Sequence, residues 1–441
     1  MLNKINTDHY KKWVWAYILL FIFEGAIRKW IFPGLSGVFL LVREPIVLYL
    51  FFVFSQKDVI KVPEIKALMI ISTICWITAL VFGHHNLFIA TYGWHIYFLH
   101  FPFILIASRI INQEDVIKIG RILLYISVPM TILIIIQFYS PQDAWVNRGI
   151  GGSMDGAGFG GAMVKGISYY RPSGTFSFTS GYVSFQQIVC SFLFYYMISN
   201  KSLPQHLQIQ QWHLYIIMLC YILSVPYSIS RSLMFITIVI ASFMVIFLFS
   251  GAIRHMKSVL YSLMGLSIVL IVIAQLNLFG EGVEVFTKRF EDASAVEGGL
   301  EGTIYDRYIG GFFNSFLMNV PILGYGLGIG TNAGAALIKG DMFSIFNAES
   351  GFGLIIGECG LILGGGIVWC RLSWTYKLAK LGYKLRRHNF LAVLLMPNML
   401  ILLSTGAIGA FPALGALVTA TFLYIASFNK MGLYTKSIVG K

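Results

Sequence analysis

Charged residues are scarce in this sequence. Asp, Glu, Lys and Arg make up only 12% of its 441 residues, whereas 57% of the residues are hydrophobic and 15% are aromatic. Soluble globular domains carry roughly 25% charged residues, so this chain has too few to cover a water-soluble surface. The shortage excludes a soluble globule and indicates a protein embedded in a lipid bilayer.

Cysteine is also rare, and its pattern carries no metal motif. The five cysteines all lie within apolar segments, with no CxxC pair and no histidine at ligand spacing; they are Cys75, Cys190, Cys220, Cys359 and Cys370. Such cysteines predict neither disulfides nor a zinc site.

Long apolar runs are abundant. A run of about 20 apolar residues crosses the hydrocarbon core as a helix. Twelve such runs lie approximately at 12–29, 35–54, 66–83, 87–108, 119–139, 181–199, 211–229, 232–250, 257–279, 350–370, 389–406 and 409–428. We expect an all-α membrane protein with about 12 transmembrane helices, forming a single polytopic domain over residues 1–441. No small-x-small cleavage site follows the first run, so we expect it to be retained as a span.

The basic residues are divided unevenly between the two sides of this predicted bundle. The side that carries both termini holds 21 of the 32 Lys and Arg residues, and the opposite loops hold 10. Because cytoplasmic loops carry the excess, both termini are predicted to be cytoplasmic. The basic residues lie mostly between apolar runs, so they do not form the single basic face that nucleic-acid binding requires.

Two of the outer loops are long, at about 140–180 and 280–349, and function is expected to concentrate there. Apolar residues recur at helical spacing in the second loop, at Ile304, Tyr308, Phe312 and Phe316. This spacing predicts either a helix lying in the membrane interface or a helix that only caps the bundle.

The second loop also contains GYGLGIGTNAG, residues 324–334, with five glycines in eleven positions. Gly-x-Gly strings approach nucleotide phosphates in some proteins. This run is predicted to lie outside the cytoplasm, where no nucleotide pool is present. We therefore expect its glycines to let the chain pack closely near the bilayer, or to bring backbone N–H groups towards a lipid-borne phosphate.

Four arginines on the outer side are candidates for binding a diphosphate: Arg171, Arg231, Arg289 and Arg307. A planar guanidinium donates two parallel hydrogen bonds and stays charged, so several arginines around one cavity can neutralise a diphosphate without a metal. The outer loops have no Asp-x-Asp pair, and we expect neither a metal nor another cofactor. The alternatives are a lipid-headgroup contact for Arg231, a solvated loop position for Arg171, and a surface ion pair with Asp306 for Arg307.

A carboxylate near the arginines is the candidate for proton transfer. Asn347 and Glu349 precede the tenth apolar run, and Glu358 follows about two turns deeper. Glu349 is placed to take a proton from an attacking hydroxyl. The alternative role for Glu349 is a favourable charge at a helix N-terminus.

Two charged pairs lie in the first two runs, Glu24 with Arg28 and Arg43 with Glu44. Charge inside a membrane costs roughly 2.5 to 3.5 kcal/mol per residue even on insertion scales. We expect these residues to form a structural network joining the first two spans, with a direct substrate role as the alternative.

Four stretches, in this order along the chain, resemble the O-antigen polymerase and O-antigen ligase superfamily of bacterial inner membranes. They are RPSGTFSFTSG before the sixth run, SISRSLMFITIVIA at the start of the eighth, GYGLGIGTN in the long loop, and FNAESGFGLIIGECGLILGGGI beyond it. The resemblance spans about residues 20–425. It implies a C-type glycosyltransferase-like fold, sugars linked to undecaprenyl diphosphate, a periplasmic active site, and neither a nucleotide-sugar donor nor a metal.

The resemblance also implies roles for residues. Arg231 matches the Ser-Arg motif of the superfamily's core, Arg307 matches the arginine of its large periplasmic loop, and Arg171 resembles an arginine of an earlier loop. With Arg231 and Arg307 as catalytic cations, Glu349 or Asp306 is the expected base. The residues expected to bind substrate are Arg171, Arg289, Asn347 and Tyr308.

One departure selects among the members of the superfamily. The ligases carry a histidine before an asparagine near the end of the large loop, whereas this chain has Phe346 before Asn347. We therefore interpret the chain as a polymerase that joins undecaprenyl-diphosphate-linked repeat units into O-antigen, capsule or exopolysaccharide. The alternatives are a ligase acting on lipid A-core and a lipid-linked oligosaccharide flippase. A chain-length regulator and a separate flippase are expected partners of a polymerase.

Overall fold

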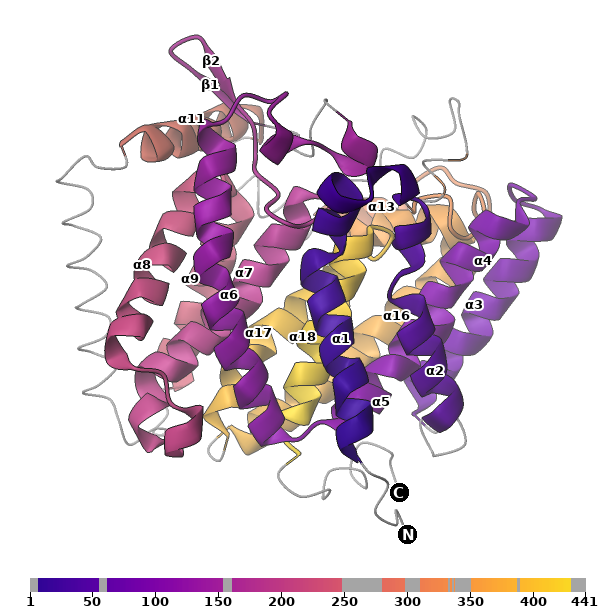
Figure 1. Ribbon diagram of the computed structural model, residues 1–441. Helices are drawn as coiled ribbons and strands as arrows, with labels where there is room; N and C mark the ends of the chain where they lie inside the picture. Colours follow the sequence, from indigo (N-terminus) through magenta and orange to yellow (C-terminus); the bar gives the residue numbers. More distant parts are fainter. Residues whose placement is uncertain are drawn as a thin grey trace.

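The computed structural model describes residues 7–54, 62–153, 161–247, 280–297, 310–331, 334, 337, 350–386 and 389–429. Within these residues the chain is mostly helical, with one short antiparallel hairpin (Figure 1). Among the described residues, five helical segments are long and apolar enough to cross a membrane: Pro63–Val81, Leu87–Ile110, Gln113–Tyr139, Gln205–Tyr227 and Gly351–Leu385. This arrangement agrees with the all-α membrane class expected from the sequence.

Most helices begin and end close to the apolar runs. They are α1 (Thr7–Ala26), α2 (Glu44–Phe54), α3 (Pro63–Val81), α4 (Leu87–His95), α5 (Phe101–Ile110), α6 (Gln113–Tyr139), α7 (Thr179–Ser199), α8 (Gln211–Tyr227), α9 (Arg231–Phe247), α11 (Gly280–Glu297), α13 (Gly311–Phe316), α16 (Gly351–Leu385), α17 (Phe390–Thr405) and α18 (Phe411–Ala426). Two π-helical turns follow α1 and α4, namely η1 (Ile27–Ile31) and η5 (Ile96–His100). The strands are β1 (Ala162–Val164) and β2 (Ile167–Tyr169). The run expected at 257–279 lies outside the described residues.

Two helices differ from the expected spans. The run at 35–54 is α-helical only from Glu44, because a proline and two glycines favour 3-10 turns before it. The resulting α2 has 11 residues, which is too few to cross a bilayer by itself. In contrast, α16 continues to Leu385, well past its expected end, with a break at Gly360, where φ is 75°. Buried residues such as Trp374 keep the part after the break in the core.

The centre of the described structure is formed by α17 and α18. Nearly all of α18 is buried, and it contacts α5, α7 and α17. Small residues such as Ala416 and Ala420 let neighbouring helices approach closely, as is common between helices in membranes. Figure 1 shows these two helices between α6 and α7 on one side and α1 and α16 on the other.

Different elements lie at the two ends of the bundle. Lys11 Nζ is 3.0 Å from Asp115 Oδ2, and Gln113 donates its N–H to Asn429 O, so the start of α1, the start of α6 and the end of α18 lie together. The strands and α11 lie at the other end, which we call the hairpin face (Figure 1). Because α11 contacts β1, parts of the two long loops meet on this face.

The glycine-rich run at 324–334 packs between α4 and α16. Backbone N–H groups at its start donate to carbonyls of α16, and the N–H of Gly330 donates to Glu358 Oε1 at 2.8 Å. A Cβ added to Gly93 of α4 would lie 2.5 Å from the backbone N of Gly328. The glycines therefore allow close packing, which is the first of the two roles expected for them. The N–H groups named here bond within the protein instead of facing a phosphate.

Candidate functional site

Two of the arginines predicted to bind a diphosphate lie close together. Arg231 is the first residue of α9 and is 8% exposed. Directly before it, Ser230 Oγ accepts the N–H of Leu233 at 3.3 Å and a hydrogen bond from Arg171 Nη2 at 3.5 Å. The structure thus brings together two distant segments at the N-terminus of α9, where the helix dipole also favours an anion.

The backbone is strained directly beside this pair. Ile229 has a φ of 48°, in the left-handed region that β-branched residues rarely adopt. Its side chain is 1% exposed, so the packing around it imposes this conformation. Strain of this kind is frequent at functional sites, where it fixes the direction of the neighbouring side chains.

A buried lysine holds the segment that follows Arg171. Lys29 Nζ, in η1, donates to Ser173 Oγ at 3.0 Å and to Gly174 O at 2.6 Å. On the other side, the N–H of Gly174 donates to Gln137 Oε1 of α6 at 2.8 Å. Arg171 therefore projects from a loop that is fixed to two helices, which limits the entropy lost when it binds an anion.

The charged pair at the end of α1 supports the same segment. Arg28 Nη1 is 3.2 Å from Glu24 Oε2 and donates to Ser177 Oγ at 3.2 Å, and all three side chains are buried. Arg43 and Glu44 instead contact α18 and η5. Arg28 also donates to Ser36 O, and the Arg43 guanidinium lies 5.4 Å from the Tyr17 ring of α1, so each pair links the first two runs through its own partners. The pair at the end of α1 also reaches the loop before α7.

Arg171 lines a cavity of about 400 Å³. Gln137, Asn147 and Ser173 contribute further polar groups to its wall, and Glu281 of α11 lies at its edge. The cavity lies at the hairpin face, between the end of α6 and the hairpin. Its size and its polar lining fit a hydrated, charged or sugar-like group.

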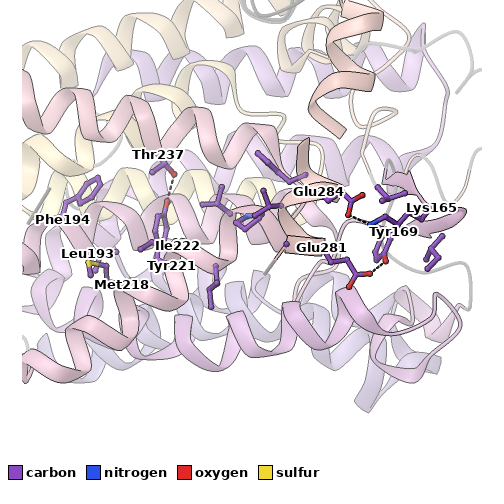
Figure 2. A pocket seen from close by; sticks show the side chains of 18 of the residues that line it. Lys165, Tyr169, Leu193, Phe194, Met218, Tyr221, Ile222, Thr237, Glu281 and Glu284 are labelled. Atoms are coloured by element: carbon purple, nitrogen blue, oxygen red, sulfur yellow. Dashed lines mark hydrogen bonds and ion pairs between the residues drawn. The ribbon is translucent and has the colours of Figure 1, made fainter. Parts of the chain in front are cut away.

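A second cavity, of about 960 Å³, adjoins the first and is mostly apolar. It lies between α7, α8, α9 and α11, with Leu193, Phe194, Met218 and Ile222 along its length (Figure 2). Tyr169 and Glu281 line both cavities, so the two are adjacent. A polar chamber therefore lies next to an apolar slot.

Two polar contacts between the hairpin and α11 lie at the larger cavity, and one of them, between Tyr169 and Glu281, also borders the smaller cavity. Lys165 Nζ is 2.8 Å from Glu284 Oε2, and this contact raises the pKa of Lys165. The Tyr169 hydroxyl donates to Glu281, which raises the pKa of Tyr169 to about 12. Near neutral pH the lysine is therefore charged and the tyrosine protonated. Figure 2 shows both contacts at one end of the slot.

No motif in the sequence singles out these four residues. Glu281 and Glu284 are three residues apart, so they share one face of α11, and Lys165 and Tyr169 lie on the hairpin. The sequence shows the spacing of the two carboxylates. It does not show that α11 packs against the hairpin, because these two elements belong to different long loops.

The other predicted site residues have different outcomes. Arg289 lies on α11, next to Phe290, whose ring is 5.9 Å from that of Phe235 on α9. This contact places the segment that carries Arg289 beside α9, although neither Arg289 nor Arg231 lines either of the two cavities. The remaining predicted site residues lie outside the described part of the chain: Asp306, Arg307, Tyr308, Asn347 and Glu349.

Part of the expected interfacial helix is described, as α13. The Phe312 ring is 5.2 Å from that of Phe352 at the start of α16, so one side of α13 packs on the bundle. Phe313 and Leu317 are 61% and 80% exposed. This short helix therefore has one face on the protein and another that is exposed. Both alternatives, a helix in the membrane interface and a helix that only caps the bundle, remain open.

Among the described residues, one group of side chains has a geometry that can hold a metal ion: Glu44, His95 and His100. These residues belong to α2, α4 and η5, and none of them lines the two cavities at the hairpin face. A metal at this position would not contact a group bound at Arg171.

Comparison with protein-family models, with curated proteins and with solved structures found no match to this chain.

Proposed function

We propose that this protein polymerises undecaprenyl-diphosphate-linked oligosaccharide repeat units into a surface polysaccharide, on the periplasmic face of a bacterial inner membrane. The proposal includes a multispanning, glycosyltransferase-like fold with about twelve spans. The observation that carries it is the hydrogen bond from Arg171 to Ser230, the residue before Arg231, beside a polar chamber that adjoins an apolar slot.

The two cavities suit the two parts of a polyprenyl-diphosphate sugar. The apolar slot, between membrane helices, matches a hydrocarbon chain, because it offers carbon-rich walls with few polar groups. The chamber beside it offers a guanidinium and several amide and hydroxyl groups. In this arrangement the diphosphate lies in the chamber beside Arg171, and the glycan extends towards the hairpin face.

The proposed reaction is a glycosyl transfer without a nucleotide donor. A sugar hydroxyl of one lipid-linked unit attacks the anomeric carbon of another, the bond from that carbon to the diphosphate oxygen breaks, and undecaprenyl diphosphate leaves. Arg231 and Arg171, together with Arg307, would stabilise the negative charge on the leaving oxygen. Glu349 or Asp306 would accept the proton of the attacking hydroxyl.

The remaining residues would position the substrate. Tyr169, fixed by Glu281 and neutral near pH 7, presents a hydroxyl next to the chamber, where it suits a sugar. Arg289, Tyr308 and Asn347 keep the binding roles predicted from the sequence. A chain-length regulator and a flippase are the expected protein partners.

A direct test uses the purified protein and a synthetic repeat unit carried on a polyprenyl diphosphate. We expect a ladder of products that differ by one repeat unit, together with released polyprenyl diphosphate. Lipid A-core can be added as a second acceptor. If the glycan is transferred only to lipid A-core, the protein is a ligase and the proposal is wrong. Movement of the lipid-linked unit across a vesicle membrane without chain growth would replace it with a flippase.

A further inference from the structure

A second cluster of chemically active side chains is buried far from the arginines. Glu44, at the start of α2, faces the span formed by α4, η5 and α5. Its Oε1 lies 3.3 Å from His95 Nε2 and 3.5 Å from His100 Nε2. The three residues are 7%, 8% and 0% exposed, so this cluster is closed to bulk water.

A local change of helix geometry brings the two histidines together. Residues five apart on an α-helix point roughly 140° away from each other, because the helix has 3.6 residues per turn. The π-helical turn η5 (Ile96–His100) widens the helix directly after His95. As a result the two imidazole centroids are 5.4 Å apart, and both Nε2 atoms face Glu44. Single π-helical turns inside α-helices are frequent at functional sites.

The polar atoms of this cluster are not satisfied by hydrogen bonds. Neither carboxylate oxygen of Glu44 and neither ring nitrogen of His100 has a hydrogen-bond partner among the described residues. The distances between the three ligand atoms suit a single shared metal ion. Buried polar atoms without partners cost about 1 to 3 kcal/mol each, so an arrangement that leaves several of them in one place needs a reason.

We propose that Glu44, His95 and His100 bind a divalent transition-metal ion, with zinc as the best match. Zinc binds imidazole nitrogen and carboxylate oxygen at about 2.0 to 2.2 Å, and a tetrahedron with such bonds has ligands about 3.3 to 3.5 Å apart. The two distances from Glu44 Oε1 fall in this range. Two histidines and one carboxylate are also a ligand set for ferrous iron, so the identity of the ion is part of the test.

A neighbouring arginine affects the charge at this site. Arg43 is fully buried and adds a positive charge beside Glu44, which opposes the binding of a cation. Its guanidinium, however, is directed to α18: Nη2 donates to Phe411 O at 2.6 Å, and Cζ lies 3.6 Å from the centre of the Phe411 ring. The carbonyl dipole and the electron-rich ring face offset part of that charge. The carboxylate of Glu44 remains available to the metal.

The position of the ion indicates a structural role. It would join α2, which is too short to span a bilayer by itself, to the 87–110 span by coordinate bonds. This inference does not rest on the proposed glycosyl transfer, because the cluster lies outside both cavities. Metal binding and polymer formation can therefore be measured separately.

The first test is the metal content of the full-length protein, purified in detergent with a tag that contains no histidine. Elemental analysis is expected to find about one zinc ion per chain, and at least about fivefold less in Glu44→Gln, His95→Gln and His100→Gln. His206→Gln, at an exposed histidine, is the matched control and should retain the zinc. Wild-type protein without bound metal, or a Glu44→Gln variant with unchanged content, overturns the proposal. If one equivalent of iron is found in place of zinc, the metal site is supported and the bound ion is iron.

A second test needs no variant, so it holds even if the substitutions prevent folding. Wild-type protein is stripped with a chelator and reloaded with Co²⁺, whose visible absorption bands report tetrahedral coordination by nitrogen and oxygen. We expect these bands at one equivalent, their loss on addition of Zn²⁺, and a lower thermal midpoint for the stripped protein. Absence of the bands, with no change in the thermal midpoint on stripping, rejects the site.

Discussion

At Arg231 and Arg171, replacing arginine with lysine keeps the positive charge but removes the planar guanidinium. Both lie at the N-terminus of α9, and Arg171 reaches Ser230 across the turn. Arginine offers a planar fork for a phosphate, whereas lysine offers a single point charge. Substitutions at these positions therefore report whether the site needs the fork or only the charge.

We predict that Arg231→Ala lowers the rate of chain growth by about two to three powers of ten, because one charge-stabilising donor is lost. Arg231→Lys is expected to recover only part of the rate. The measurement is product length and rate with a lipid-diphosphate repeat unit, at equal protein levels. Arg386→Ala, at a partly exposed arginine whose guanidinium donates to the nearby Tyr383 O, is the control and should behave as wild type. Normal chain length in Arg231→Ala would remove the catalytic role of this residue.

His84 gives a prediction for pH dependence. Its Nε2 contacts Leu327 O at 3.1 Å, and its Nδ1 accepts the N–H of Asn86 at 3.0 Å, so the neutral ring fits both partners. Burial lowers the pKa of His84 below its usual 6.5. The neutral ring therefore stabilises the fold fully above about pH 6.5, and this stabilisation is lost as the pH falls through the lowered pKa.

We expect the packing of the 324–331 segment to loosen between about pH 7 and pH 5, because a protonated Nδ1 would face the N–H of Asn86. Hydrogen exchange of this segment at the two pH values measures the effect. In His84→Gln the exchange should be faster at both pH values. The pH-dependent change caused by the His84 imidazole should be absent. Equal exchange of the wild type at both values would contradict the assignment.

At the scale of elements, the contact between α1 and the segment before α7 positions Arg171. A Cβ added to Gly25 would lie 2.2 Å from the backbone N of Ser177, so only glycine allows this approach. The contact explains how two parts of the sequence about 150 residues apart form one support. It also offers a test in which no charge is changed.

Gly25→Ala is predicted to destabilise the protein by about 1 to 3 kcal/mol, because the backbone at 175–177 must move. The thermal midpoint in detergent should fall, and the yield of long polysaccharide should fall with it. Gly34→Ala provides the matched control, since an added Cβ there meets no atom within 4 Å. A Gly25→Ala protein as stable as Gly34→Ala would show that the two segments are not in this contact.

At the scale of the whole molecule, the topology decides on which side of the membrane the hairpin face and the opposite end of the bundle lie. Lys165 lies on the hairpin face with its side chain 75% exposed, and Lys118 lies near the start of α6, at the opposite end, with its side chain 40% exposed. Four of the native cysteines are buried, and Cys220 is partly buried. Introduced cysteines at these two positions can therefore report topology.

We expect a membrane-impermeant maleimide to label Lys165→Cys in intact spheroplasts and Lys118→Cys only after the membrane is opened. The physical basis is the excess of Lys and Arg on the side that carries the termini. Wild-type protein, carried through the same procedure, measures the background from Cys220. Labelling of Lys118→Cys in intact spheroplasts would invert the topology and remove the periplasmic site.

The sequence by itself determined the class of the protein and its candidate residues. The low charge and the long apolar runs are enough to predict a helical membrane protein. In lipid the backbone N–H and C=O groups must bond to each other, and a helix satisfies them within one segment. The chemistry of arginine selected four candidates, Arg171, Arg231, Arg289 and Arg307, whose roles remain predictions. For the glycines at 324–334 the sequence left two roles open, close packing or approach to a lipid phosphate, and the structure shows the close packing.

Only the tertiary structure decided which of these residues meet. The junction of the hairpin with α11, the anchoring of Ser173 by Lys29, and the cluster around Glu44 all join segments that are far apart in the chain. The histidine pair also depends on a π-helical turn that periodicity alone does not predict. Contacts of this kind follow from how helices pack against each other, and packing depends on many side chains at once instead of on a local pattern.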